Sequence, residues 1–273
     1  MADSLDGKVA IVTGGGSGIG EALSVELARR GARVTVADIR KDDAERVAAL
    51  IAASGGKAHA QTVDVAVEED VRGLVEETAA AHGRLDYVFN NAGIVIGGDA
   101  RDLTLDQWRQ VLDVNLYGVL YGTFAAYPIM VKQGYGSIVN TASAAGLIPL
   151  PMDGAYTTAK HAVVGFSRAL RLEAAGLGVH VSVICPGWVR TRIFEHSVAV
   201  NLPDELKTPR RVTMVEPDRA AREILDGVAR NREVIIFPAM IRRLWRLHFF
   251  VPGLVYRRML HGISEARKQR IEP

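Results

Sequence analysis

Tyr156 and Lys160 stand four residues apart near the start of a predicted helix, residues 155–175. This spacing places both side chains on one helix face. A free phenol has a pKa of about 10 and is a poor acid or base at neutral pH. A neighbouring ammonium stabilises the phenolate and lowers that pKa toward the value that proton transfer needs. Alone, such a pair is usually a solvated helix pair, but Ser143 follows a predicted strand thirteen residues earlier and could hold a substrate oxygen opposite Tyr156.

A glycine-rich turn follows the first predicted strand, with Gly14, Gly18 and Gly20 spaced G-x-x-x-G-x-G and with Ser17 and Ile19 between them. Such a turn lets backbone N–H groups and the positive end of the next helix meet a pyrophosphate. The motif is weak evidence by itself. Here it lies between a strand and a helix, which is the context that dinucleotide binding requires.

Asp38 ends the second predicted strand, 18 residues after Gly20. A carboxylate there can accept both hydroxyls of an adenosine ribose and would repel a 2′-phosphate, which favours NAD over NADP. The next residue is Ile39, where an NADP-binding protein usually has arginine. Arg40 and Lys41 follow and keep NADP open as an alternative. Asp38 could instead cap the next helix.

Strand-like and helix-like segments alternate along the chain. Near-continuous apolar strands separated by helices predict a doubly wound α/β fold, a seven-stranded parallel sheet covered on both faces. An irregular stretch, residues 188–215, is long enough for a binding loop. The predicted strands are residues 8–13, 32–38, 57–63, 85–93, 136–141, 179–185 and 233–237, and the predicted helices are residues 19–30, 43–53, 68–82, 104–132, 155–175 and 217–230.

The net charge of +2 is uneven along the chain. Residues 239–273 hold eight basic and two acidic residues, while the rest holds 25 basic and 29 acidic residues. A body of charge −4 argues against a nucleic-acid partner. The single cysteine, Cys185, excludes an intramolecular disulfide, and the seven histidines show no metal-ligand pattern, so we expect no metal. Asp3 and Asp6 are atypical of a signal peptide, so we expect a cytoplasmic protein.

The ordered motifs resemble the single-domain form of the short-chain dehydrogenase/reductase family, over about residues 6–238. We therefore expect a Rossmann-like domain, residues 1–238, followed by a basic amphipathic extension, residues 239–273. The motifs that carry the resemblance are residues 13–20, Asp64-Val65, Asn90-Asn91-Ala92-Gly93, Asn115, Ser143, Tyr156-x-x-x-Lys160 and Pro186-Gly187.

The resemblance implies a role for each matching residue. Tyr156 would exchange the alcohol proton, Lys160 would bind the nicotinamide ribose and lower the pKa of Tyr156, and Ser143 would orient the substrate carbonyl. Asn115 would hold a water that links Lys160 to solvent. The implied cofactor contacts are Gly14, Ser17, Gly18, Ile19, Gly20, Asp38 and Ile39 at the phosphate and ribose, Asp64 and Val65 at the adenine, Asn91, Ala92 and Gly93 behind the cofactor, and Pro186, Gly187, Val189 and Thr191 at the carboxamide.

The resemblance implies hydride transfer between NAD(H) and a secondary alcohol or ketone. Trp188 and Phe194 in the loop after residue 187 hint at a lipophilic substrate, such as a steroid, retinoid, terpenoid or long-chain alcohol. An NADPH-dependent reductase of 3-oxoacyl thioesters or ketones is the alternative. A non-catalytic dinucleotide sensor on the same fold is a hypothesis of a different class, although a sensor has no need of Ser143, Tyr156 and Lys160.

The extension, residues 239–273, allows three interpretations. Ile241, Leu244, Trp245 and His248 fall on one predicted helix face, which could pack on the body or on a partner subunit. The extension could also close a hydrophobic substrate pocket. Its mixture of arginine, tryptophan and phenylalanine is also typical of a helix at a membrane surface, which would make the protein membrane-peripheral. The family resemblance implies a homodimer or homotetramer formed through the helix of Tyr156 and the one before it.

Overall fold

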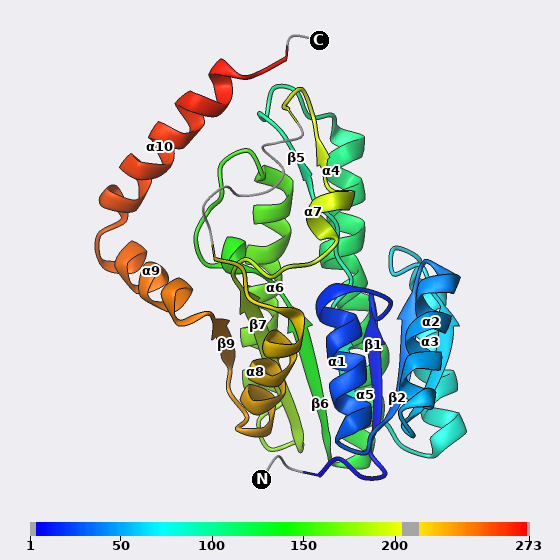
Figure 1. Cartoon of the computed structure of the whole chain (residues 1–273). Coiled ribbons are helices and arrows are strands. Elements are labelled where there is room, and N and C mark those ends of the chain that lie inside the picture. The colour runs from blue at the N-terminus through cyan, green and yellow to red at the C-terminus, as the bar shows by residue number, and fades with distance from the viewer. Residues whose placement is uncertain (1–3, 204–212, 272–273) are drawn as a thin grey trace.

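A single parallel sheet forms the centre of the computed structural model, which describes residues 4–203 and 213–271 (Figure 1). The strand order is β3-β2-β1-β4-β6-β7-β9, and each neighbouring pair is parallel. The expected seven-stranded doubly wound sheet is confirmed. The strands are β1 Val9–Thr13, β2 Arg33–Asp38, β3 Lys57–Thr62, β4 Tyr87–Asn90, β6 Gly136–Thr141, β7 Val179–Pro186 and β9 Val234–Phe237.

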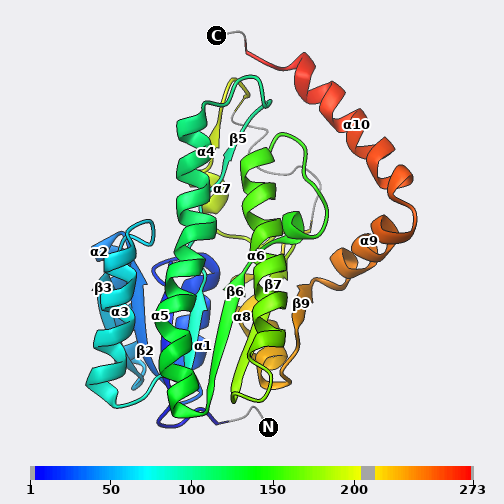
Figure 2. The same cartoon turned by 180° about the vertical axis from the view of Figure 1, so that it is seen from behind.

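Helices cover both faces of this sheet, as the views from front and back show (Figures 1 and 2). The alternation of side chains along β1 explains the two layers, because Ala10 and Val12 join one buried cluster and Val9 and Ile11 join the other. The first layer holds α1 Gly18–Arg29, α2 Lys41–Ala53 and α8 Pro217–Ala229, and the second holds α3 Glu68–His82, α5 Gly118–Gln133 and α6 Gly154–Glu173.

The long helix expected over residues 104–132 is interrupted. It consists of α4 Leu105–Leu112, a π-helical segment Asp113–Tyr117, and α5. Within the described residues, Leu105–Gln133 is one stretch long and apolar enough to cross a membrane by length and composition. Ala126 and Met130 on α5 are nevertheless fully buried beneath the sheet, which is the packing of a core helix.

The irregular stretch expected over residues 188–215 contains a short helix, α7 Ile193–His196, and a two-residue strand, β8 Val198–Ala199. β8 pairs in parallel with β5 Ile96–Gly97, which follows β4 in the chain and lies outside the main sheet. This small sheet stands above the carboxyl ends of the main strands (Figure 1). Residues 204–212 of the stretch lie outside the described residues.

Two helices form the extension, α9 Ala239–Phe250 and α10 Pro252–Lys268. Ile241 on α9 is buried, and Leu244, Trp245 and His248 are less exposed than the arginines beside them, so the face predicted to be buried is the inner one. α10 arches away from the sheet and returns to the body only at its far end (Figures 1 and 2). There Arg267 pairs with Asp99 at 2.9 Å, and the Ile271 amide donates to the Asn201 carbonyl at 2.9 Å.

Candidate active site

Three glycines shape the turn between β1 and α1. Gly14 and Gly18 have φ of +61° and +55°, the left-handed region that favours glycine. A Cβ at Gly14 would lie 2.9 Å from Cα of Ala92, and a Cβ at Gly20 would collide with the Gly14 carbonyl. The turn is thus packed backbone on backbone, and α1 begins within it at Gly18. This geometry leaves the helix N-terminus open to an anion, as a pyrophosphate requires.

A cleft of about 580 Å³ lies beside this turn and includes Gly18 and Thr191 in its lining. A Cβ at Gly18 would lie 2.8 Å from Cγ2 of Thr191, so the segment after β7 closes directly over the phosphate turn. Ser17 precedes α1 without a side-chain capping bond, and Ile19 is partly buried beside it. The turn and the helix end fit the pyrophosphate of a dinucleotide. The cleft shares only Gly18 and Thr191 with the expected cofactor contacts and otherwise runs along α1, α2 and α8.

Asp38 is buried where β2 ends and is tied to the phosphate turn. Its Oδ2 accepts from the Gly16 amide at 3.0 Å, and its Oδ1 accepts from the Arg40 amide at 3.0 Å. The interpretation that Asp38 caps the next helix is wrong, because α2 begins after Arg40. These bonds hold the carboxylate beside the phosphate turn, where the resemblance predicts the adenosine ribose. Ile39 is exposed at its side.

The carboxyl ends of β3 and β4 hold the other expected cofactor residues. The Asn91 side-chain amide donates to the Thr13 carbonyl at 3.1 Å and thereby joins the ends of β1 and β4. Asp64 accepts from the Ala66 amide at 2.9 Å, which fixes the turn after β3. Val65 is buried against Gly118 at the start of α5. All of these residues line the same edge of the sheet, although their contacts with a cofactor remain predictions.

Lys160 carries a fully buried amine at the centre of the site. Its Nζ donates to the Thr141 carbonyl at 2.9 Å and lies 5.4 Å from the centre of the Tyr156 ring. A Cβ at Gly93 would lie 3.5 Å from this Nζ and 2.7 Å from Oδ1 of Asn115. Gly93 thus keeps the space between the amine and Asn115 free of any side chain.

Asn115 occupies the π-helical segment and is fully buried. Its Nδ2 donates to the carbonyls of Ile94 at 2.9 Å and Val111 at 3.0 Å, whereas Oδ1 has no partner among the described residues. A buried acceptor beside an amine is a site that suits an ordered water. This arrangement supports the predicted water link between Asn115 and Lys160, and it excludes a solvent-facing Asn115.

The pKa of Tyr156 is shifted in the direction opposite to the one expected from the sequence. Burial raises the pKa of Tyr156 to about 12, although its hydrogen bond with Ser143 acts in the opposite direction. Burial lowers the pKa of Lys160 to about 7. Lys160 was expected to lower the pKa of Tyr156, but in the protein without cofactor desolvation dominates both groups. Tyr156 is therefore protonated at neutral pH.

Asp153 is a residue of the site that sequence reasoning missed. It precedes α6, and burial raises its pKa to about 6, while its charge acts to raise the pKa of Tyr156. Its Oδ1 lies 2.6 Å from the position of a Cβ on Gly97 in β5, so the carboxylate is wedged between the small sheet and α6. Its place three residues before Tyr156, on the same face of the first turn, was the available signal.

The two residues expected to contact the substrate, Trp188 and Phe194, lie in different environments. Trp188 packs in a cluster with Ile241 and Trp245 of α9, and Phe194 is partly buried in α7. A Cβ at Gly187 would lie 2.5 Å from Cγ1 of Ile241, so α9 supports the Pro186–Gly187 turn from behind. Val189 forms a bridge with Val215. These contacts make the extension part of the wall around the site.

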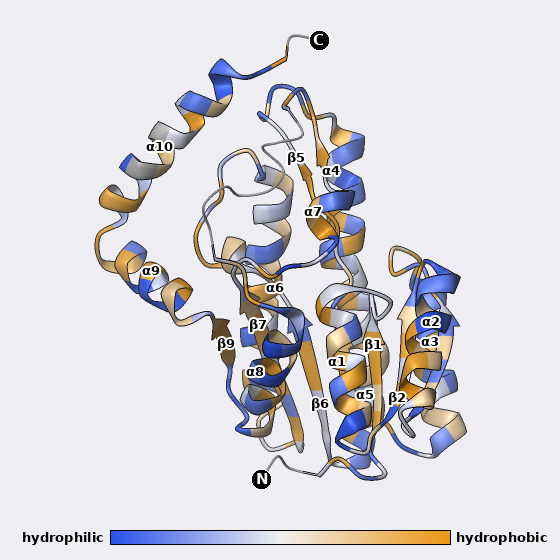
Figure 3. Ribbon diagram, in the orientation of Figure 1, coloured by the Kyte–Doolittle hydropathy of each residue, from blue (hydrophilic) through white to orange (hydrophobic). Residues whose placement is uncertain are grey.

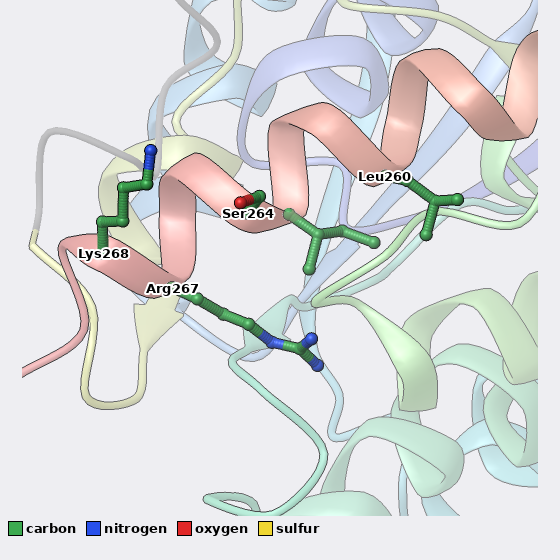
Figure 4. A pocket seen from close by; sticks show the side chains of 5 residues that line it. Leu260, Ser264, Arg267 and Lys268 are labelled. Atoms are coloured by element: carbon green, nitrogen blue, oxygen red, sulfur yellow. The ribbon is translucent and has the colours of Figure 1, made fainter.

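The inner side of α10 borders a separate pocket of about 460 Å³ (Figure 4). Leu260 and Ile263 give it an apolar part, and Ser264, Arg267 and Lys268 give it a polar part. None of the residues that line this pocket belongs to the expected catalytic set.

A family model described as short chain dehydrogenase matches residues 8–201. The chain belongs to the short-chain dehydrogenase family. It is accordingly an oxidoreductase with a Rossmann-like fold, and the family binds NAD or NADP.

Related proteins are similar over most of this length. The 2,5-dichloro-2,5-cyclohexadiene-1,4-diol dehydrogenase of Sphingobium indicum is 45% identical over 196 residues, which cover 71% of this chain and 77% of the relative. The cyclohexanol dehydrogenase of an Acinetobacter species is 39% identical over 206 residues, covering 74% and 82%. A Burkholderia phymatum short-chain dehydrogenase/reductase, solved in complex with NAD, superposes with a TM-score of 0.83 at 29% identity, covering 92% of this chain and 96% of that one.

Replacing Tyr156 with phenylalanine should lower turnover by at least ~100-fold, since the variant lacks the hydroxyl that is predicted to exchange the substrate proton. Binding of the reduced cofactor, measured by fluorescence titration, should stay within about twofold because the ring remains. Tyr135→Phe, at an exposed tyrosine remote from the site, is the control and should retain full turnover. Turnover near the wild-type value in Tyr156→Phe would contradict the assignment.

Replacing Lys160 with methionine should stabilise the cofactor-free protein while abolishing turnover. Because burial lowers the folded-state pKa to about 7, the wild-type protein gains stability as pH rises from 7 toward 10.5. The variant should therefore melt at least about 3 °C higher at pH 6, with a difference that shrinks toward pH 10. Scanning calorimetry at pH 6, 8 and 10 measures this, with the exposed Lys57→Met as control. A difference independent of pH would show that Lys160 is not desolvated.

Proposed function

We propose that this protein transfers a hydride between NAD(H) and a secondary alcohol or ketone. The observation that carries the proposal is the assembly of Ser143, Tyr156, Lys160 and Asn115 at the edge of the sheet where the phosphate turn lies. Bound nicotinamide supplies the hydride acceptor or donor at C4. The protein's own residues orient the substrate oxygen and exchange its proton.

The protonated state of Tyr156 at neutral pH suits it to donate a proton to a carbonyl oxygen during reduction. Ser143, which hydrogen-bonds Tyr156, would hold the same oxygen. In the direction of oxidation Tyr156 must lose its proton. The groups that would pass this proton on are the amine of Lys160, which lies over the Tyr156 ring, and Oδ1 of Asn115, which has no partner among the residues that the structure describes. A non-catalytic dinucleotide sensor would need none of these groups.

NAD is the cofactor that we propose, because the buried carboxylate of Asp38 would repel a 2′-phosphate. Its two hydrogen bonds to backbone amides fix it in place. An NADPH-dependent reductase of ketones or 3-oxoacyl thioesters is the alternative function, favoured by the arginines near Asp38.

The substrate that we propose is a lipophilic cyclic secondary alcohol. Two relatives are named for cyclic alcohols, a chlorinated cyclohexadienediol and cyclohexanol. The apolar cluster beside Tyr156, with Ile96 and Val111 buried and Trp108 and Val200 packed against them, supports an apolar ring. Steroids and terpenoids are larger members of this chemical class, whereas a long-chain alcohol or retinoid would fit by lipophilicity alone.

A panel of secondary alcohols assayed with both cofactors tests these proposals together. Cyclohexanol and larger cyclic alcohols should give at least about tenfold higher kcat/KM than open-chain alcohols of equal carbon number, since a rigid ring loses less entropy on binding. NAD should exceed NADP by at least about tenfold. A higher kcat/KM with NADP would support the alternative function. Tight NAD binding without turnover of any alcohol or ketone would support the sensor.

We also propose a cytoplasmic homo-oligomer that associates through α5 and α6. Phe124 on α5 is 61% exposed and contacts Phe166 on α6 at a ring distance of 5.9 Å, and Leu172 on α6 is 79% exposed. Large apolar side chains at such exposure on adjacent helices are typical of a subunit interface. A homodimer would bury both helices against their symmetry copies, and a homotetramer would need a second surface.

The extension combines the three interpretations of its sequence. Its first helix packs on the body, α10 frames the substrate side, and the corner between them is proposed to touch a membrane surface. Figure 3 shows this corner coloured hydrophobic at the margin of the molecule. Phe249 and Phe250 are 73% and 77% exposed, and Leu254 is 56% exposed. Residues 239–264 carry five arginines and no acidic residue, which suits an anionic lipid surface.

Sedimentation with lipid vesicles tests the membrane contact. The wild-type protein should bind vesicles rich in phosphatidylglycerol more than pure phosphatidylcholine vesicles, and less at high salt. Changing Phe249 and Phe250 together to serine should weaken binding at least about tenfold, because two buried aromatic side chains are lost. Leu105→Ser, at a 70% exposed leucine on α4, is the control. Wild-type protein that stays in the supernatant would contradict the contact.

A further inference from the structure

Three guanidinium groups converge on the carboxylate of Asp43 in the first turn of α2. Arg40 Nε lies 2.7 Å from Oδ2, while Arg192 Nη2 and Arg46 Nε lie 2.9 Å and 3.9 Å from Oδ1. The three arginines come from the loop after β2, from α2, and from the segment after the Pro186–Gly187 turn. A single acidic residue thus holds together cations from three parts of the chain.

This cluster rests on the phosphate turn. The Gly16 carbonyl accepts from Arg46 at 2.9 Å and from Arg192 at 3.4 Å. The amide of the same Gly16 donates to Asp38 at 3.0 Å, and a Cβ at Gly16 would lie 2.7 Å from Cβ of Asp43. The guanidinium groups therefore border the carboxylate that would read the adenosine ribose.

The charges at this border nearly cancel. Three arginines face Asp43, Asp38 and Glu21, the last of which pairs with Arg46 at 2.7 Å. Burial acts to raise the pKa of Asp43, but Arg192, Arg40 and Arg46 hold it below its usual value, so Asp43 is charged at neutral pH. The arginine side chains are 38–49% exposed, so they can turn toward a new anion without leaving a buried ion pair.

We propose that Asp43 sets cofactor specificity by occupying guanidinium groups that would otherwise bind a phosphate on the ribose 2′ position. The proposal rests on the proposed function, because it assumes that a dinucleotide binds along the phosphate turn. Without the Asp43 charge, Arg192 and Arg40 offer donors suited to a phosphate dianion. Asp38 would repel that phosphate directly, whereas Asp43 keeps the guanidinium groups paired so that they do not bind the phosphate.

Calorimetric titration with two adenosine fragments isolates the 2′-phosphate. The probes are 2′,5′-ADP and 5′-AMP, measured on the full-length wild-type protein, on Asp43→Asn and on Asp42→Asn. Asp42 is the neighbouring exposed carboxylate, so its variant loses the same charge and makes a matched control. Asp43→Asn should bind 2′,5′-ADP at least about tenfold more tightly than Asp42→Asn does. Its affinity for 5′-AMP should stay within about twofold.

A second substitution tests whether the increased affinity for 2′,5′-ADP comes from the arginines around Asp43. Arg192→Gln in the Asp43→Asn background should remove most of the gain for 2′,5′-ADP. A gain below tenfold relative to Asp42→Asn, an equal gain for 5′-AMP, or a gain that survives Arg192→Gln overturns the proposal. If melting curves show that Asp43→Asn is unfolded, Asp43→Ala takes its place under the same criteria.

The same fragments separate this proposal from the proposed function. Wild-type kinetics that prefer NADP would refute the assignment of NAD, while the fragment affinities would still decide the role of Asp43. If NAD is preferred and Asp43→Asn leaves the fragments unchanged, the inference fails and the proposed function stands. If the fragment affinities support the role of Asp43, combining Asp38→Ala with Asp43→Asn should raise kcat/KM for NADP more than either change alone.

Discussion

A buried amine is the constraint on which the architecture of the site depends. Lys160 is 2% exposed, and a cation at such a position is stable only where protein oxygens replace water. One oxygen is the Thr141 carbonyl at the end of β6. Oδ1 of Asn115 lies on the far side of the space kept open by Gly93, where an ordered water could join it to the amine. Strand ends, the π-helical segment and α6 must therefore keep their mutual positions for the amine to be tolerated.

Close packing at the carboxyl ends of the strands explains why the glycines are placed as they are. Gly14 meets Ala92, Gly18 meets Thr191, and Gly187 meets Ile241, each at a distance that a Cβ would not permit. These contacts bring the ends of β1, β4 and β7 to one edge, which is where a parallel sheet presents its ligands. The last of them also ties the extension to the turn expected beside the carboxamide, so α9 is a structural part of the site.

Local sequence patterns were sufficient to predict the sheet and to place the candidate catalytic pair on one helix. Periodicity placed all seven strands, and the four-residue spacing of Tyr156 and Lys160 put both on α6. The interruption at Asn115 could not be predicted, because the hydrogen bond that accompanies the π-helical turn joins its amide to the Ile94 carbonyl, 21 residues earlier. The pairing of β5 with β8 joins residues about 100 positions apart, and each strand is only two residues long, too short for a sequence pattern to identify.

The electrostatic environment was the part least visible in the sequence. The spacing of Tyr156 and Lys160 predicted a lowered phenol pKa, yet the structure raises it, because the degree of burial decides the direction and spacing says nothing about burial. The cluster at Asp43 was equally hidden. Arg192 lies 149 positions away from it in the chain, and only the fold brings the two together.

The net charge of +2 is the sum of an acidic body and a basic extension, and the two attract each other. Asp102 accepts from Arg270 at 2.7 Å, a hydrogen bond that, against the effect of burial, lowers the pKa of Asp102 to about 2. Asp99 pairs with Arg267, so two acidic residues of the body hold the far end of α10. Both pairs lie beyond the corner between α9 and α10 and fix the far end of the basic helix to the body. Residues 239–264 carry no acidic residue in their own segment. The charge of the extension is thus divided between Arg267 and Arg270, which pair with the body, and exposed arginines of the first helix, Arg242, Arg243 and Arg246.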